Sequence, residues 1–339
     1  MAFVFGLLLI LLSFWQCKML IYGVQQGVGQ MRIVSNARPI AEVMADPEFP
    51  DSLKAQLDLV QEIRQFAIDS LGLKDSKNYQ SVYDQQGKPV LWVLSASDKF
   101  ALKPYKWRYP MLGALGYKGF FKEDRALREQ QKFEDWGYDT DVGEVGAWST
   151  LGWFKDPILS NMLEKSPGGL ARLIIHEMTH ATLFVKGDAE YNENLATFVG
   201  DNGAELFLVF KYGEDSKEYK DYLGGISDVR QFGEHILSGS QRLDSLYQTF
   251  TESQPDSVKA GQKKAMITTI LQDADTLSLY NSKRFSHLIA GKYIPNNTFF
   301  MTFRMYRQEQ NSFQKEFQEQ YNSDFKRYLA YLKEKYPSV

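Results

Sequence analysis

Residues 173–184 of the chain read Leu-Ile-Ile-His-Glu-Met-Thr-His-Ala-Thr-Leu-Phe. The pattern predicts a helix in which His176 and His180, four residues apart, lie on the same side, so that both imidazoles can reach one ion. Glu177 lies about 100° round the helix from His176 and can reach a water on that ion without binding the ion itself. It is the only charged residue of the stretch. The apolar neighbours therefore favour a helix buried beneath a cleft.

The residue types in this stretch suit zinc. Zinc lowers the pKa of a bound water towards neutrality, and a nearby carboxylate can then accept its proton. The sequence therefore predicts that His176 and His180 hold Zn²⁺ and that Glu177 is the general base. The alternative interpretation is a buried helix whose two histidines are simply hydrogen-bonded.

A catalytic zinc takes a third protein ligand and keeps one position open. Residues 186–188, Lys-Gly-Asp, predict a turn, after which a second helix can return antiparallel to the first. Glu193 in the first turns of that helix would face the ion, and the apolar residues around it indicate that this helix is buried. Glu190, closer to the start of the helix, remains the alternative ligand.

The His-Glu-x-x-His helix followed by Asn192-Glu193-x-x-Ala196-Thr197 resembles the gluzincins, the peptidase clan in which thermolysin-type enzymes use two histidines and one glutamate. The chain is more closely similar to one bacterial family, labelled predicted aminopeptidases, whose members often carry a lipoprotein-like or membrane leader. The resemblance implies zinc, a peptidase activity and a peptide substrate. The matching stretches cover much of the chain: residues 37–40, 116–121, 148–154, 156–160, 176–180, 185–188 and 192–197.

The resemblance also bears on the residues behind the metal ligands. Thermolysin-type enzymes carry an aspartate one turn after the glutamate ligand, where it orients a zinc-bound histidine, and this chain has Thr197 there. A threonine can orient an imidazole by a hydrogen bond but supplies no charge. Asp201, one further turn along, is expected to compensate.

Peptidases of this clan hold their substrate as an added strand against a sheet edge that lies just before the zinc helix. Residues 145–150 occupy that place in the sequence, although they also suit an ordinary buried strand. Glu144 could pair with the free amine of a substrate, which would make the enzyme an aminopeptidase. The backbone groups expected to bind the peptide belong to Gly146, Ala147, Trp148 and Ser149.

Hydrolysis of an amide also needs a hydrogen-bond donor for the tetrahedral oxyanion. Tyr306 is the first candidate, because it matches a tyrosine of the family pattern that follows Asn296-Asn297. His235 and His287 are the alternatives.

The remaining periodicity predicts an α+β fold, with a small N-terminal sheet and helices packed on a mostly helical C-terminal half, as in zincins. We expect one unit over residues 31–339, mixed α/β over 31–156 and mainly helical over 157–339. Residues 25–50 resemble a linker into this unit. Helices are expected over 51–73, 122–136, 170–185 and 192–212, and strands over 90–94, within 107–117 and over 138–150.

The first residues predict membrane attachment. Residues 2–15 form an apolar run interrupted only by Ser13, and this length suits a signal-peptide core better than a full bilayer span. The family's lipidation site would fall on Cys17, whereas an extension through Val24 would give a retained membrane helix. We expect residues 1–30 to be a membrane leader or anchor and the rest to lie on the extracytoplasmic, periplasmic side.

Composition excludes some functions and leaves others open. The net charge is −3 with mixed signs throughout, so no electrostatic footprint for nucleic acid is visible. The single cysteine excludes an intramolecular disulfide, and nothing indicates the oligomeric state. Besides an aminopeptidase, the sequence allows a zinc endopeptidase or other amide hydrolase at the membrane, or a catalytically inactive membrane-attached binding protein.

Overall fold

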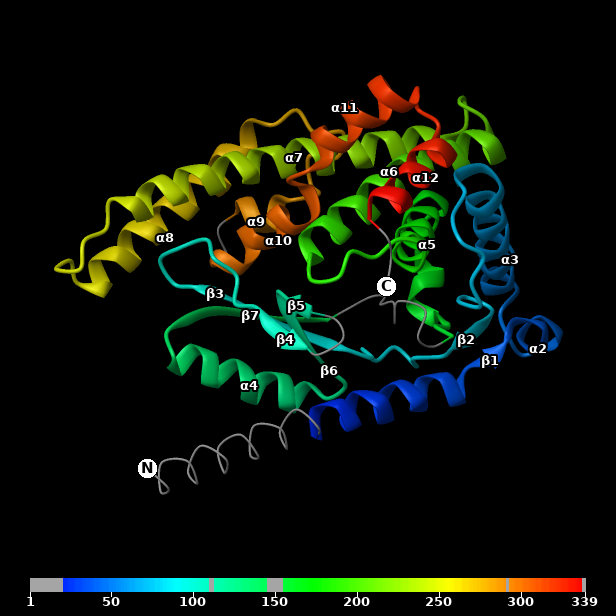
Figure 1. Ribbon diagram of the computed structural model, residues 1–339, viewed down its shortest axis with the longest axis horizontal. Coiled ribbons are helices and arrows are strands. Elements are labelled where there is room, and N and C mark those ends of the chain that lie inside the picture. The colour runs from blue at the N-terminus through cyan, green and yellow to red at the C-terminus, as the bar shows by residue number, and fades with distance from the viewer. Residues whose placement is uncertain (1–20, 110–112, 145–154, 291–292, 337–339) are drawn as a thin grey trace.

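The computed structural model describes residues 21–109, 113–144, 155–290 and 293–336 (Figure 1). Small sheets occupy the N-terminal half and helices fill most of the C-terminal half, which confirms the predicted α+β class. The strands are β1 (Arg38–Pro39), β2 (Ser81–Tyr83), β3 (Trp92–Asp98), β4 (Trp107–Tyr109), β5 (Gly113–Leu115), β6 (Tyr117–Phe120), β7 (Tyr138–Glu144) and β8 (Ile158–Leu159).

The predicted helix over residues 51–73 is present as α3 (Asp51–Phe66), which continues in a short π-helical turn to Leu71 and ends at Gly72 with φ of 75°. The other α-helices are α2 (Ile40–Ala45), α4 (Glu123–Asp135), α5 (Pro167–Thr182), α6 (Ala189–Tyr212), α7 (Lys217–Gln248), α8 (Asp256–Asp273), α9 (Ser286–Ile289), α10 (Asn297–Arg307), α11 (Gln310–Tyr321) and α12 (Phe325–Lys335).

The main sheet has the strand order β6-β3-β7 and is antiparallel throughout. Helix α4 packs on this sheet from one side and α10 contacts it from the other (Figure 1). A second sheet has the order β1-β2-β8, and its β8 pairs with β2 in parallel. The mainly helical second half thus includes one short strand, β8, where the buried Ile158 pairs with Val82.

Residues 25–50 are not the linker that their glycines and prolines suggest. Residues 21–36 are helical, and the Tyr22 hydroxyl and Gln26 Nε2 both donate to the Gly119 carbonyl, at 2.9 and 3.2 Å. Gly29 is needed for this contact, because an added Cβ would lie 2.2 Å from the Phe121 ring. The segment therefore packs on the edge strand β6.

Residues 1–20, which carry most of the predicted leader, lie outside the described residues. Of the helices within the described ranges, none combines the length and apolar character that crossing a bilayer needs. Membrane attachment, the periplasmic location and the division at residue 30 stay predictions.

Helices α5 and α6 are packed side by side and run antiparallel, as the turn at Gly187 predicts. Ser166 caps α5 by accepting from the Gly169 N–H, and Asp188 caps α6 by accepting from the Tyr191 N–H. Where the helices approach most closely, a Cβ on Gly200 would lie 2.9 Å from the Arg172 carbonyl oxygen. A glycine there allows α6 to carry its side chains up to those of α5.

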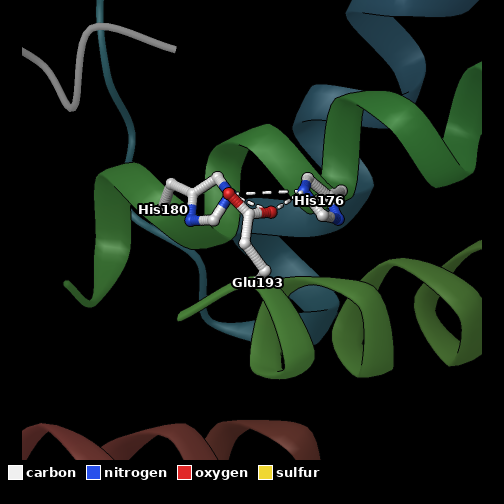
Figure 2. Close-up of side chains that lie close together, drawn as sticks. All are labelled: His176, His180 and Glu193. Carbon is white, nitrogen blue, oxygen red and sulfur yellow. Dashed lines mark hydrogen bonds and ion pairs between the residues drawn. The ribbon is translucent and has the colours of Figure 1, made fainter. Parts of the chain in front are cut away.

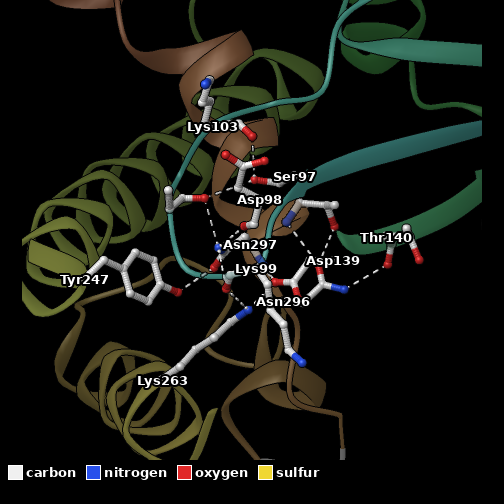
Figure 3. A network of polar contacts seen from close by, with 12 residues as sticks. Ser97, Asp98, Lys99, Lys103, Asp139, Thr140, Tyr247, Lys263, Asn296 and Asn297 are labelled. Carbon is white, nitrogen blue, oxygen red and sulfur yellow. Dashed lines mark hydrogen bonds and ion pairs between the residues drawn. The ribbon is translucent and has the colours of Figure 1, made fainter. Parts of the chain in front are cut away.

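A buried polar network fixes the start of α10 against the main sheet (Figure 3). The Asn297 side chain donates to the Asp98 carbonyl at 2.8 Å and accepts from the Tyr247 hydroxyl at 2.7 Å, while its backbone N–H donates to Asp139. Lys263 of α8 pairs with the same Asp139. The network joins α7, α8 and α10 to β3 and β7 and so sets the position of the side chains at the far end of α10.

Candidate metal centre

Three side chains from α5 and α6 converge in the interior (Figure 2). His176 Nε2 lies 3.2 Å from His180 Nε2, and Glu193 Oε2 lies 3.4 Å from the first and 3.5 Å from the second. The three side chains are only 8 to 13% exposed. Among the described residues these three form a group that could hold a metal ion.

The distances fit a metal site. Ligand atoms 2.0–2.1 Å from a tetrahedral zinc lie about 3.3 Å from one another, which is close to all three separations in this group. Without an ion, burial would raise the pKa of the Glu193 carboxyl, but the two imidazoles outweigh burial and hold that pKa well below its ordinary value. Two imidazoles and one ionised carboxylate are a donor set that divalent zinc accepts.

Glu190, the alternative third ligand, does not lie near the two histidines. Glu190 lines a different cavity of about 640 Å³ between the start of α6 and the helices α11 and α12, and this cavity contains no member of the histidine pair. Burial raises the pKa of Glu190, with Asp188 adding to the shift. Glu190 therefore points away from the group that could bind a metal.

Glu177 lies beside the histidines but is not part of their hydrogen-bonded cluster. It is 6% exposed, and its Oε2 has no hydrogen-bond partner among the described residues. Burial raises the pKa of this carboxyl, while His176 and His180 oppose the shift. Because this buried oxygen lies beside the two histidines without a hydrogen-bond partner, it can bind a proton or a water molecule there.

A pocket of about 370 Å³ opens onto His176 and Glu177. Tyr306 from the end of α10 lines it, with its ring stacked at 6.5 Å from the ring of His176. Burial raises the pKa of the Tyr306 phenol well above its ordinary value, with Glu193 adding to the shift. Tyr306 therefore lies in the pocket beside His176, and its role as the oxyanion donor stays a prediction.

The two other donor candidates lie elsewhere. His235 Nε2 is 2.6 Å from the Ile270 carbonyl oxygen, between α7 and α8, and His287 is in the short helix α9. Neither residue lines the pocket beside His176. Glu144 is exposed at the end of β7, and the substrate-binding prediction for Gly146, Ala147, Trp148 and Ser149 falls outside the described residues.

Asp201 pairs with two arginines, and its expected role in orienting an imidazole stays a prediction. Its Oδ1 accepts from Arg172 Nε at 2.5 Å and its Oδ2 accepts from Arg307 at 2.6 Å. Thr197 does line the pocket, but its hydroxyl has no hydrogen-bond partner among the described residues, and neither has His180 Nδ1. The orienting role of Thr197 stays a prediction.

Sequence reasoning missed three residues of this site. Arg172 lies one turn before His176 on the same face of α5, so helical spacing could have revealed it. Arg307 follows Tyr306 directly. Tyr117 of β6 belongs to a stretch that matches the family pattern, and its buried phenol has a raised pKa, first from burial and then from the carboxylates Glu193 and Glu177.

Comparisons with known proteins agree with this picture. The profile of the family described as "Putative aminopeptidase" matches residues 21–336, nearly the whole chain. Searches of curated proteins and of solved structures return no match.

Proposed function

The chain belongs to the "Putative aminopeptidase" family, and we propose that it is a zinc metallopeptidase whose metal is held by His176, His180 and Glu193. The observation that carries the proposal is the convergence of these three donors at ligand-to-ligand distances, with the free carboxylate oxygen of Glu177 beside them. Zinc, when bound, supplies Lewis acidity to a substrate carbonyl and lowers the pKa of water.

The residues of the chain supply the proton transfers. Burial raises the pKa of Glu177, so its carboxylate is a stronger base than a solvated glutamate and can take a proton from the attacking water and pass it to the leaving amine. Tyr306, which lines the same pocket as His176 and Glu177, donates a hydrogen bond to the carbonyl oxygen as that oxygen gains charge. Glu193 and Glu177 both contribute to the raised pKa of Tyr117, so a second phenol lies near these carboxylates.

The family description favours action at the amino end of the substrate. Glu144 at the end of β7 is the carboxylate we propose for the free amine, with the following residues 145–150 as the strand that binds the peptide. The alternatives to an aminopeptidase are an endopeptidase or a hydrolase of another amide at the membrane, both of which would use the same metal chemistry. A catalytically inactive binding protein would not use it. We place the chain at the membrane through residues 1–30, on the periplasmic side.

Comparing each free peptide with its acetylated twin tests the aminopeptidase assignment. Acetylation removes a charge-assisted hydrogen bond to the amine, so the blocked peptide should be cleaved about ten- to a hundredfold more slowly. Products of a peptide library are identified by mass spectrometry. Equal rates, with cuts away from the N-terminus, would contradict an aminopeptidase and leave the zinc chemistry standing.

Replacing Glu193 by glutamine should weaken zinc binding, because a neutral amide replaces a charged ligand. The matched control is Glu190→Gln, three residues earlier on the same helix and in a different cavity, which should bind zinc as the wild type does. Zinc affinity is measured by competition with a chromogenic chelator. Full affinity in the first variant together with loss in the second would make Glu190 the third ligand.

A further inference from the structure

One buried carboxylate holds two arginines at the wall of the pocket. Arg172 comes from α5, Arg307 from α10, and Asp201, which lies between them on α6, is 6% exposed. Asp201 is itself held in place, since the Tyr222 hydroxyl donates to its backbone carbonyl at 2.9 Å. The two guanidinium groups are therefore fixed by three helices rather than left to move in solvent.

Most of the donors of these arginines are not used within the described part of the protein. A guanidinium has five N–H donors, yet Arg172 uses only Nε and Arg307 only one terminal nitrogen, both on Asp201. Both side chains line the pocket that opens onto His176 and Glu177. The unused donors therefore belong to two side chains that line the pocket beside His176 and Glu177.

Basic side chains outnumber carboxylates in the described lining of this pocket, and Asp201 behind the arginines offsets one of their charges. The described lining includes Lys165 as well as the two arginines, and the only carboxylate in that lining is Glu177. A bound divalent ion would add further positive charge. A planar group with two oxygens and one negative charge is the natural partner of paired guanidinium groups.

We propose that Arg172 and Arg307 bind a carboxylate of the substrate, and that Asp201 positions them to do so. The inference rests on the proposed peptidase function and names its substrate class. Because the arginines share a pocket of about 370 Å³ with His176 and Glu177, the carboxylate lies close to the bond that is cut. The substrate is therefore a short peptide with its C-terminal carboxylate next to that bond, or a peptide with an acidic side chain there.

Binding measured without turnover tests the proposal. The full-length, zinc-loaded Glu177→Gln protein is titrated with trialanine and with trialanine amide by calorimetry. We expect the free acid to bind about ten- to a hundredfold more tightly than the amide. A second arm compares the binding of Ala-Glu-Ala amide with that of Ala-Gln-Ala amide. Tighter binding of the glutamate peptide would show that the bound carboxylate is that of a side chain.

Substitution of the arginines, in the same Glu177→Gln background, shows whether they cause the tighter binding of the free acid. Arg172→Gln or Arg307→Gln should bring the ratio of acid to amide affinity close to one, and the Lys variants, which keep the charge but lose the planar fork, should give an intermediate ratio. Arg304→Gln is the matched control, since Arg304 lies on the same helix α10 but pairs with Asp244. Its ratio should equal that of the parent.

A purely structural role for the two arginines would change thermal stability without changing the ratio. Equal affinities in both arms, or a preference that survives both arginine substitutions, would overturn the proposal. The wild-type enzyme distinguishes this failure from that of the peptidase function. If it cuts peptides but prefers neither trialanine over its amide nor the glutamate peptide over its glutamine twin, only the carboxylate site is wrong, whereas absence of all peptide cleavage would remove the peptidase function and the inferred substrate class together.

Discussion

Replacing Glu177 with glutamine is expected to lower the rate of peptide hydrolysis by about a hundredfold or more, while zinc stays bound. Glutamine has nearly the same shape as glutamate but cannot accept a proton from water at neutral pH. Glu177 is buried beside the histidines, with one oxygen that has no hydrogen-bond partner in the described structure. Removal of its charge should therefore change the chemistry more than the fold.

Rates are measured as kcat/KM on a peptide that the wild type cleaves, together with zinc content and melting temperature. The zinc content and the melting temperature should match those of the wild type, because Glu177 is not one of the three converging donors. Hydrolysis by Glu177→Gln at the wild-type rate would show that another residue is the base.

Replacing either histidine by alanine is expected to reduce bound zinc from about one ion per chain to almost none. Each imidazole supplies one of only three protein donors, and no other group among the described residues could replace it. The variants are purified in parallel, and zinc is quantified by atomic emission. Peptidase activity should be lost in parallel with the bound zinc.

His287→Ala is the control for this experiment, since His287 lies in α9, away from the pocket beside His176. It should retain zinc and activity at wild-type levels. Zinc retained in full by both His176→Ala and His180→Ala would place the metal elsewhere in the chain.

The part of the site that could be predicted lies within short stretches of sequence. His176, Glu177 and His180 share one helix, so the helical period alone places them together. Glu193 follows after a single turn, and the glycine in that turn makes the antiparallel return predictable. Tyr306 came only from the resemblance to a family, because nothing local connects it to a helix more than a hundred residues earlier.

The features that were missed or misjudged depend on partners far along the chain. Asp201 pairs with Arg307, 106 residues away, so this pairing could not be inferred from the spacing of Asp201 to the glutamate. Strand β8 has two residues and exists because it pairs with β2. The glycines before residue 30 indicated a linker, but Gly29 is there to admit the Phe121 ring.

Reconstitution of the full chain with zinc shows whether peptide cleavage depends on the metal. The protein is stripped with a chelator, zinc is added back in steps, and cleavage of a peptide mixture is followed by mass spectrometry. We expect cleavage to disappear on stripping and to return in proportion to zinc, reaching its maximum at about one ion per chain. Cleavage that persists in the metal-free protein, or a protein that holds one zinc and cuts no peptide, would contradict this expectation.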